Sequence, residues 1–462
     1  MNRGDARRRR TAAHSVSRRD FLKWSGAGLA GAAALSATGC ADIASGFTRT
    51  KPAGPNTLIL SKGPDTTGTL QKVIDKFNKE GHNFTVEWRE MPADTGQYFD
   101  KMRTEFQVGG GTVDVIGADV IWPAQLAANG WIEDLSDQFT EEMQSDFLDA
   151  SIQASIYKGK IYGVPWYADA GLLYYRKDLL DKAGLKPPGT WSELREQAKK
   201  VMDQEGIPYG FTFQGAEYEG GVCNECEYVW NAGGEILAPD DPAKVEIGQQ
   251  ASVKGHEEVR EHVTSGAAPL AVATYKELES LTPFIAGDAV FNRNWPFGYA
   301  IATGGKAAGS SLKPEWVGVA QLPVSEGSDS HAACLGGWDF CINSASAKKE
   351  QAWEFIQWMI KPEIMATFAV DAGYLPPRKS MFQDKKLTTK DQPVMGLAKS
   401  SYEVTRPRPS VNPFYSDMSL DMAQSYNDIV KGDATPQQGV NTMQSQLQRI
   451  ANAANEVFNI GK

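Results

Sequence analysis

Short apolar strands and amphipathic helices alternate along most of this 462-residue chain. Residues 58–61 have the length and composition of a buried strand, and apolar side chains then repeat at helical spacing over residues 70–77. A further strand is expected over residues 85–91, and residues 113–116 predict another before a helix over residues 123–129. Alternation of this kind is typical of α/β folds built on mainly parallel sheets.

The alternation continues in the second half of the chain, with a strand over residues 172–175 and helices over residues 178–183 and 191–202. Thr190 is the expected N-cap of the second of these helices, because Glu193 stands where a capping box needs it. Later apolar stripes predict packed helices at residues 348–360, 363–372 and 437–458. A chain of this length exceeds what one hydrophobic core usually supports, so two lobes are expected.

The N-terminal segment has the features of an export signal. Residues 17–23 read S-R-R-D-F-L-K, which matches the twin-arginine pattern. Arginine pairs also occur by chance in basic tails such as residues 7–10, but the Gly- and Ala-rich run that follows has the length of a signal h-region. This run is too short and too weakly apolar to span a bilayer. Residues 1–39 are therefore read as a signal peptide and excluded from the fold.

Cys40 closes the signal segment and is the expected site of lipid attachment. A lipoprotein signal usually carries a leucine-like residue three positions before this cysteine, and Ala37 departs from that pattern. Residues 40–56 contain Pro and Gly and are expected to act as a tether. The predicted location is outside the cytoplasm, anchored to the membrane by lipid.

Charge limits the partners of the mature chain. The first 40 residues carry eight basic and two acidic side chains, so the net charge of −10 for the whole chain becomes −16 for the remainder. An excess of negative charge of this size argues against nucleic acid or an anionic membrane surface as a partner. It also suits a protein that stays soluble outside the cell.

Four cysteines remain once Cys40 is assigned to lipid: Cys223, Cys226, Cys334 and Cys341. An even number in an oxidising compartment favours disulfides, and pairing of Cys223 with Cys226 is the favoured interpretation, although spacing alone leaves the connectivity open. A C-x-x-C spacing also occurs in zinc and redox sites. The five histidines are scattered without ligand spacing, so no metal site and no cofactor are expected.

Several short motifs, taken in order, resemble those of the extracellular sugar-binding proteins of bacterial ABC importers (solute-binding protein family 1), and most closely the trehalose/maltose-binding lipoproteins. The motifs are Asp65-Thr66-Thr67, D-V-I-G-A-D at residues 114–119 with Trp122, V-P-W-Y-A-D at residues 164–169 before L-L-Y-Y-R-K-D-L-L, N-W-P-F at residues 294–297, Leu335-Gly336-Gly337 and Arg408-Pro409. The resemblance covers nearly the whole mature chain.

The resemblance implies a two-lobed α/β fold of the periplasmic-binding-protein type, with the ligand held between the lobes. Lobe 1 would comprise residues 57–167 and 340–361, and lobe 2 residues 168–339 and 362–462. It also implies a monomer that closes around a disaccharide and delivers it to membrane permease subunits driven by a separate ATPase. This chain carries no Walker phosphate-binding sequence, so ATP hydrolysis is assigned to other subunits.

Candidate ligand-binding residues follow the predicted strands. Asp65 lies just after the first strand, where the loops of a parallel sheet face a crevice, although capping the next helix would explain it equally well. Asp119 ends another strand, with Trp122 close behind it. Thr66 joins this group through the family motif. Carboxylates accept hydrogen bonds from sugar hydroxyls, while aromatic rings cover the C–H faces of a sugar.

The remaining candidates come mainly from the family positions. Asp169 lies in the expected first crossing between the lobes, and Trp295 is presented by the rigid Pro296. Each also has a structural explanation, as a turn residue or a core tryptophan. Four further residues complete the predicted site: Glu219, Gly336, Gly337 and Arg408, with Arg406 as an alternative to Arg408. Glu219 is a weaker candidate, as are Gln214 and Tyr218 in the same glycine-rich stretch, because an exposed loop would have a similar sequence.

The predicted function is capture of an α-linked gluco-disaccharide by lobe closure, without catalysis. One alternative is an exported glycoside hydrolase, in which Asp119 would act with Asp169 or Glu219 as the pair of carboxylates. Another is a receptor for a non-sugar solute such as a peptide. The resemblance favours the sugar receptor over both.

Overall fold

The computed structural model describes residues 54–65, 67–384, 387 and 402–460, all of which belong to one unit of the chain. The predicted signal peptide at residues 1–39, Cys40, most of the tether and Thr66 lie outside the described residues. Within the described residues, no helix is both long enough and apolar enough to cross a membrane.

The first sheet has the strand order β14-β13-β3-β1-β2, with β6 also paired to β13. Strands β1, β2 and β3 run parallel, as the sequence predicts, whereas β13 is antiparallel to both β3 and β6. Its strands are β1 (Thr57–Lys62), β2 (Thr85–Glu90), β3 (Val115–Asp119), β6 (Val164–Ala170), β13 (Ala333–Ile342) and β14 (Thr405–Arg406).

The second sheet has the order β12-β7-β11-β8, and its strands are β7 (Leu172–Arg176), β8 (Tyr209–Thr212), β11 (Ala289–Asn294) and β12 (Val317–Ala320). The prediction of a mainly parallel sheet is wrong here, because β7 is antiparallel to both β11 and β12. Strand β7 follows β6 of the first sheet after Gly171 alone, so it enters the second sheet from the first and not through a helical crossover from another strand of its own sheet.

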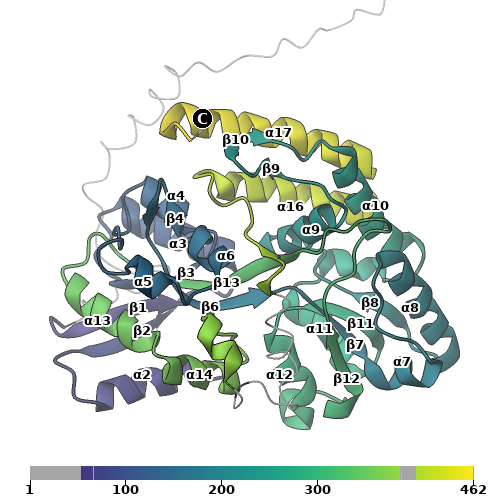
Figure 1. Ribbon diagram of the computed structural model, residues 1–462, viewed down its shortest axis with the longest axis horizontal. Helices are drawn as coiled ribbons and strands as arrows, with labels where there is room; N and C mark the ends of the chain where they lie inside the picture. The colour runs from purple at the N-terminus through teal and green to yellow at the C-terminus, as the bar shows by residue number, and fades with distance from the viewer. Residues whose placement is uncertain (1–53, 66, 385–386, 388–401, 461–462) are drawn as a thin grey trace, which may run out of the picture. The chain divides into compact units, whose positions relative to one another are not determined.

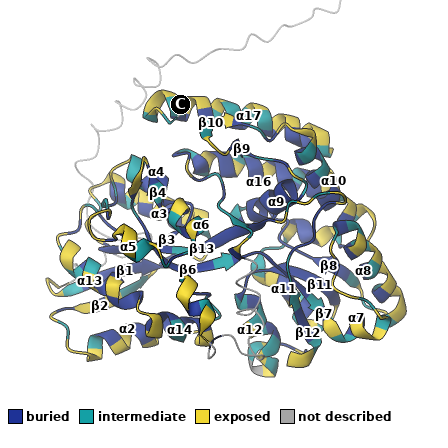
Figure 2. Cartoon of the chain, viewed as in Figure 1, coloured by how far each residue is buried: buried dark blue, intermediate teal, exposed yellow. Residues whose placement is uncertain are grey.

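Helices cover both sheets, and Figure 2 shows the strands largely buried while the outer helix faces are exposed. They are α2 (Thr69–Lys79), α3 (Thr95–Gln107), α4 (Pro123–Ala128), α5 (Glu141–Gln144), α6 (Asp149–Ala154), α7 (Lys177–Ala183), α8 (Trp191–Glu205), α9 (Glu219–Asn231), α10 (Gln250–Thr264), α11 (Glu277–Ala286), α12 (Phe297–Thr303), α13 (Lys349–Met359), α14 (Pro362–Asp371), α16 (Tyr415–Lys431) and α17 (Pro436–Phe458). The predicted capping box of Thr190 and Glu193 begins α8. Two small hairpins complete the fold: β4 (Ile156–Tyr157) with β5 (Lys160–Ile161), and β9 (Leu237–Ala238) with β10 (Asp241–Val245).

Helix α9 is the most enclosed helix of the second sheet's core, since every residue from Gly220 to Asn231 is buried. It contacts α10, α16 and β13, and α16 in turn lies beside α17 (Figure 1). This burial places the N-terminus of α9 next to the long strand β13 of the first sheet. Strand β13 of the first sheet and helix α9 beside the second sheet therefore come into contact, and the candidate site forms where they meet.

The structure does not form the predicted Cys223–Cys226 disulfide: both thiols are free, and the geometry of α9 is against the pairing. The two cysteines stand three positions apart on the regular helix α9. Side chains at that spacing have Cβ atoms about 5–6 Å apart, whereas a disulfide needs about 3.5–4.5 Å.

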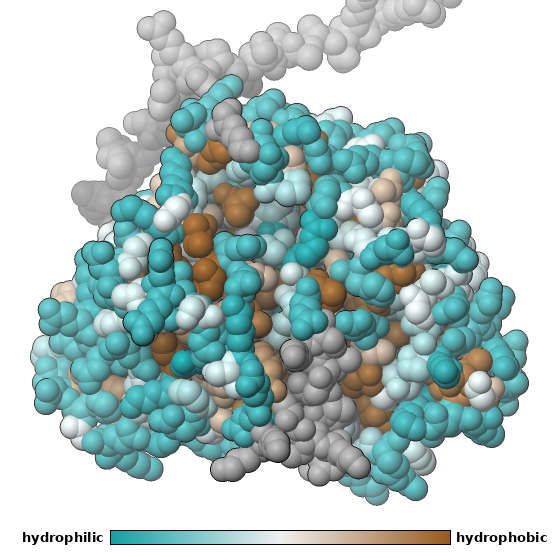
Figure 3. Space-filling view, viewed as in Figure 1, coloured by the Kyte–Doolittle hydropathy of each residue, from teal (hydrophilic) through white to brown (hydrophobic). Residues whose placement is uncertain are grey.

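The described surface is mostly hydrophilic on the face shown in Figure 3. Its large exposed apolar side chains come from different elements: Val108, Leu270, Leu278, Val370, Val411, Leu420 and Val457. Single apolar side chains of this kind are ordinary on a surface in contact with water. The lobe boundaries given above stay a prediction; packing places α14 against α2, beside the first sheet.

Candidate functional site

A buried guanidinium connects the two parts of the site. Arg408 is 4% exposed, and its Nη2 donates to Asp119 Oδ1 at 3.1 Å, while its Nη1 donates to Glu219 Oε1 at 2.5 Å. Asp119 ends β3 of the first sheet, and Glu219 begins α9 beside the second. One cation therefore holds carboxylates from both sides, which is the planar, two-pronged role to which arginine is suited.

Glu219 is held by more than this arginine. Its Oε1 also accepts from the Tyr415 hydroxyl at 2.7 Å, and its Oε2 accepts from the Ser419 hydroxyl, both on α16. Burial raises the pKa of Glu219, while Arg408 and the Ser419 hydrogen bond lower it. The N-terminus of α9, the start of α16 and the end of β3 are thus fixed to one another by polar contacts.

Lys62 is a second cation of the site and was not predicted from the sequence. It ends β1, is 7% exposed, and its ammonium lies 3.1 Å from the centre of the Trp338 ring. Burial lowers the pKa of Lys62 to about 7, although the charges of Asp119, Asp169 and Asp65 act in the opposite direction. The charges of three predicted carboxylates therefore act on this one ammonium group.

Asp169 completes this charged cluster. Burial raises the pKa of Asp169 to about 7, against the lowering effect of Lys62 and Arg293, and Asp119 raises it further. With pKa values of about 7, the Asp169 carboxyl and the Lys62 ammonium can each gain or lose a proton near neutral pH at little cost in free energy. Such groups can exchange hydrogen bonds with neutral hydroxyls without leaving a strongly hydrated ion stranded.

Gly336 is the point where Trp295 and Asp169 meet. A Cβ atom built on Gly336 would lie 3.0 Å from the Trp295 ring and 3.2 Å from Asp169 Cβ, and Gly336 pairs with Asp169 across β13 and β6. Trp295 is 9% exposed and its ring lies 4.1 Å from the Arg293 guanidinium. The indole that follows β11 of the second sheet therefore packs directly on the strand of the first.

Two predicted residues have structural contacts that account for them. The Asp65 carboxylate accepts from the backbone N–H groups of Thr67 at 2.9 Å and Leu70 at 2.6 Å, so it secures the start of α2, while its charge also acts on Lys62. Trp122 is 2% exposed and meets Tyr98 and Trp338 edge-on. Its place is beneath Trp338, where it supports that ring.

Other contributors were missed by the sequence reasoning. Trp338 follows the Gly336-Gly337 pair, and Tyr167 on β6 stacks on Tyr374 with ring centres 4.3 Å apart. The ammonium of Lys62 lies 5.9 Å from the Tyr167 ring. Residues at the carboxyl ends of parallel strands face the ligand crevice, and this rule could have identified Lys62 at the end of β1. The Gly336-Gly337 pair could have pointed to the adjacent Trp338. No local signal marks the stacked tyrosines.

The structure also separates the two arginines of the R-P-R-P segment. Arg406 donates to Glu235 Oε2 at 2.5 Å and covers the Trp230 ring at 4.7 Å, away from the carboxylates described above. Gln214, a weaker candidate, is buried and bonded to Ser280, Asn224 and Arg293. Its amide supports the second sheet's core through these contacts.

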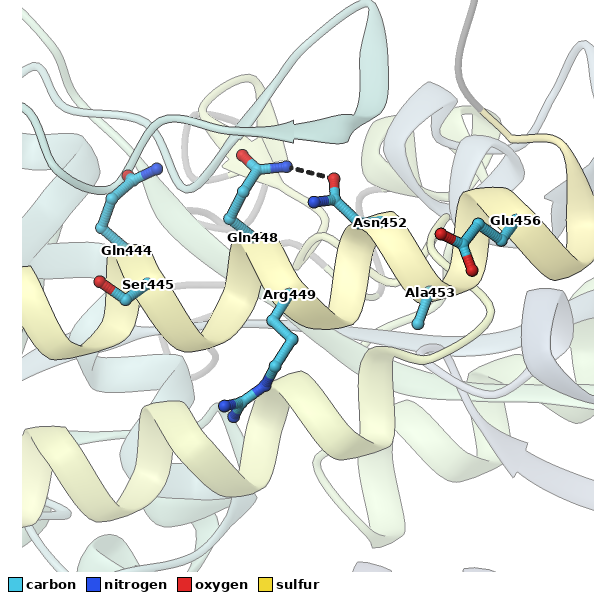
Figure 4. Close-up of a pocket in the computed structure, with 7 residues that line it drawn as sticks. All are labelled: Gln444, Ser445, Gln448, Arg449, Asn452, Ala453 and Glu456. Atoms are coloured by element: carbon cyan, nitrogen blue, oxygen red, sulfur yellow. Dashed lines mark hydrogen bonds between the residues drawn. The ribbon is translucent and has the colours of Figure 1, made fainter. Parts of the chain in front are cut away.

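A hollow of about 600 Å³ lies along α17 and does not touch the charged cluster (Figure 4). Gln444, Ser445, Gln448, Arg449, Asn452, Ala453 and Glu456 line it. Gln444 and Gln448 use their side-chain amides to bond the backbone of β10 at 3.0–3.1 Å. No aromatic ring lines this hollow, so the cluster around Arg408 is the better candidate for a ligand site.

Comparison with known families decides what kind of protein this is. Residues 63–366 match the model of the bacterial extracellular solute-binding proteins, and residues 15–37 match the signal sequence of the twin-arginine translocation pathway. The chain belongs to the bacterial extracellular solute-binding proteins. Its twin-arginine signal directs it out of the cytoplasm, as the sequence predicts.

Similar proteins and structures support the same fold. A probable ABC transporter-binding protein of Deinococcus radiodurans is 30% identical, over 82% of this chain and 90% of that protein. Maltose-bound MalE3 of T. maritima is 33% identical with a TM-score of 0.78, covering 85% of this chain and 99% of the other. A solute-binding protein of Agrobacterium radiobacter in complex with ribitol is 27% identical with a TM-score of 0.72, over 86% and 100%. The prediction of a two-lobed α/β fold is confirmed.

Proposed function

We propose that this solute-binding protein is the sugar receptor of an ABC importer, and that it captures an α-linked gluco-disaccharide of the trehalose or maltose type. The observation that carries this proposal is the bridge from Asp119 through Arg408 to Glu219, set beside Trp295 and Trp338. These groups are paired carboxylates, a two-pronged donor and aromatic rings. Together they complement the hydroxyls and C–H faces of an uncharged sugar.

Lobe closure is the proposed mechanism of capture. Besides the Arg408 bridge, Lys276 on α11 bonds to Asp94 at the start of α3 at 2.8 Å, and Ser416 on α16 bonds to Gln125 on α4 at 2.6 Å. With the predicted lobe boundaries, each of these contacts joins a residue of lobe 1 to a residue of lobe 2. A ligand touching both lobes adds to them and shifts the population toward the closed state, which then docks on the permease.

Hydrolysis is the weaker alternative. A glycoside hydrolase needs one carboxyl that gives a proton and one that acts as base or nucleophile on the other side of the bond. Here Asp119 and Glu219 both bond the same guanidinium. Both carboxylates accept hydrogen bonds from this cation, and Glu219 also accepts from the hydroxyls of Tyr415 and Ser419. Such contacts favour a role in binding over proton transfer.

A polyol is the second candidate ligand. The similar structure that holds ribitol and the similar structure that holds maltose share this fold. The charged cluster around Lys62 would accept the hydroxyls of either ligand. The aromatic rings at Trp295 and Trp338 favour the cyclic sugar, because a ring offers them a flat C–H face.

A thermal-shift panel tests the proposal. We expect trehalose or maltose, present at 100 times its dissociation constant, to raise Tm by about 5 °C without release of glucose, while ribitol and mannitol raise it less. The Trp295→Ala variant should bind the same sugar at least tenfold more weakly, about 1.4 kcal/mol. Glucose release would support the hydrolase, and a larger shift with ribitol would support the polyol receptor.

We also propose that the exported chain is anchored by lipid on Cys40. The proposal is supported by the position of this cysteine directly after the twin-arginine signal at residues 15–37. Cys40→Ala should move the protein from the membrane fraction to the soluble extracytoplasmic fraction, as measured by immunoblotting. Cys341→Ala serves as the matched control and should leave the protein in the membrane fraction. Retention of the Cys40→Ala variant in the membrane fraction would refute the anchor.

A further inference from the structure

Three of the four described cysteines gather in the core of the second sheet. Cys223 and Cys226 lie on α9, and Cys334 lies at the start of β13; all three are at most 2% exposed. Cys341, further along β13, belongs to the core cluster of the first sheet. The arrangement differs from the one that spacing suggested, because the neighbour of Cys223 comes from a different element.

Burial raises the pKa of the Cys223 thiol, and the Cys334 side chain is close enough to raise it further, while the Cys334 thiol itself donates to the Leu335 carbonyl oxygen at 3.6 Å. The backbone of β13 is also bonded to a side chain of α9, since the N–H of Cys334 donates to Glu227 Oε1 at 3.1 Å, and Glu227 lies one helical turn beyond Cys223. Helix α9 and strand β13 contact each other along this stretch. Cys223 and Cys334 are thus held close together by the packing of α9 on β13 and by the hydrogen bond from the Cys334 N–H to the Glu227 carboxylate.

We propose that Cys223 and Cys334 form a disulfide in the exported protein, and that the structure describes its reduced form. The oxidant is a disulfide donor of the oxidising compartment, either a protein or a small molecule. The two S–H bonds of Cys223 and Cys334 break, one S–S bond forms between them, and the S–S bond of the donor is reduced to two thiols. Two electrons and two protons pass to the donor.

The twin-arginine pathway exports proteins that are already folded. The two cysteines therefore reach the oxidising compartment inside a packed core, where the formation of the disulfide is slow. The reactive species is the thiolate, and burial raises the pKa of the Cys223 thiol well above its usual range. Both sulfurs are also shielded from a donor by the surrounding core. Oxidation therefore waits for local opening of α9 from β13, and the rate should increase in mild denaturant.

The bond would brace the ligand site. Helix α9 carries Glu219 at its N-terminus, and β13 carries Gly336 two positions after Cys334. Cys334 follows Cys223 by 111 positions in the sequence, so the link closes a long loop that contains β11 and β12 of the second sheet. Closing a loop of this length constrains the unfolded chain strongly.

Peptide mapping of the full-length chain tests the proposal. The chain is recovered from the cell envelope with free thiols alkylated at once, and a second sample is equilibrated with oxidised and reduced glutathione in dilute urea and then returned to buffer. Trypsin leaves Cys223 with Cys226 in one peptide and Cys334 with Cys341 in another. The Cys226→Ala/Cys341→Ala double variant removes this ambiguity.

We expect a linked pair of peptides in both samples, retained in the double variant and lost in Cys223→Ala and in Cys334→Ala. Reduction should lower Tm by about 5–10 °C in the wild type and in the double variant, but not in the two single variants. Four free thiols after equilibration, or a link that persists in Cys334→Ala, would overturn the proposal. Neither result depends on which solute is bound.

Discussion

The Arg408→Ala variant is expected to lose ligand affinity by at least 100-fold, about 2.7 kcal/mol, and to lose about 3–5 kcal/mol of unfolding free energy. The reason is that Asp119 and Glu219 are both largely buried and share this one guanidinium. Alanine leaves two carboxylates facing each other without a cation. Calorimetric titration with the best sugar of the panel measures the first effect, and urea denaturation measures the second.

Two matched variants isolate the cause. Arg406→Ala removes a neighbouring arginine whose partner, Glu235, is partly exposed, so we expect about 1 kcal/mol or less in stability and unchanged affinity. Arg408→Lys keeps the charge but loses the fork, since an ammonium bonds as a single point. It should retain more stability than alanine and still bind the sugar poorly. Wild-type affinity in Arg408→Ala would exclude this residue from the ligand site.

The local structure of the chain could be predicted because its signals are local. The apolar period over residues 70–77 predicted α2, and the capping box of Thr190 and Glu193 marked the start of α8 correctly. The placement of Asp65 and Asp119 after strands also followed from local pattern. These features depend on neighbours within one or two turns of the chain.

Features set by distant packing could not be predicted. The position of Lys62 at the end of a strand is a local signal, but its burial could not be predicted, because Trp338, which covers it, lies 276 positions later in the sequence. The direction of β7 depends on its pairing with β11 and β12. Trp122 was predicted to stack on ligand, and the structure places it under Trp338 instead. The neighbour of Cys223 that we propose as its disulfide partner, Cys334, lies on another element for the same reason.

Gly337 occupies the most constrained backbone position of β13. Its φ is +114°, and a Cβ atom there would lie 2.2 Å from the carbonyl oxygen of Tyr167 on the paired strand β6. The Gly337 carbonyl also accepts from the N–H of Val120, beyond the end of β3, at 3.3 Å. A side chain at this position must displace backbone rather than a flexible side chain, so the strain cannot be relieved cheaply.

We therefore expect Gly337→Ala to lower the unfolding free energy by about 3–5 kcal/mol and to weaken sugar binding, because β13 also carries Gly336 against Trp295. Gly184→Ala is the matched control: its φ is +69°, no atom lies within 4 Å of the added Cβ, and the left-handed conformation alone costs about 1–2 kcal/mol. Urea denaturation measures the unfolding free energy of both variants, provided that the dependence on urea concentration is the same in each. The difference between them is the cost of the steric contact with Tyr167, beyond the cost of the left-handed conformation. Equal losses in the two variants would show that the contact with Tyr167 carries no cost, and that β13 can shift without disturbing the site.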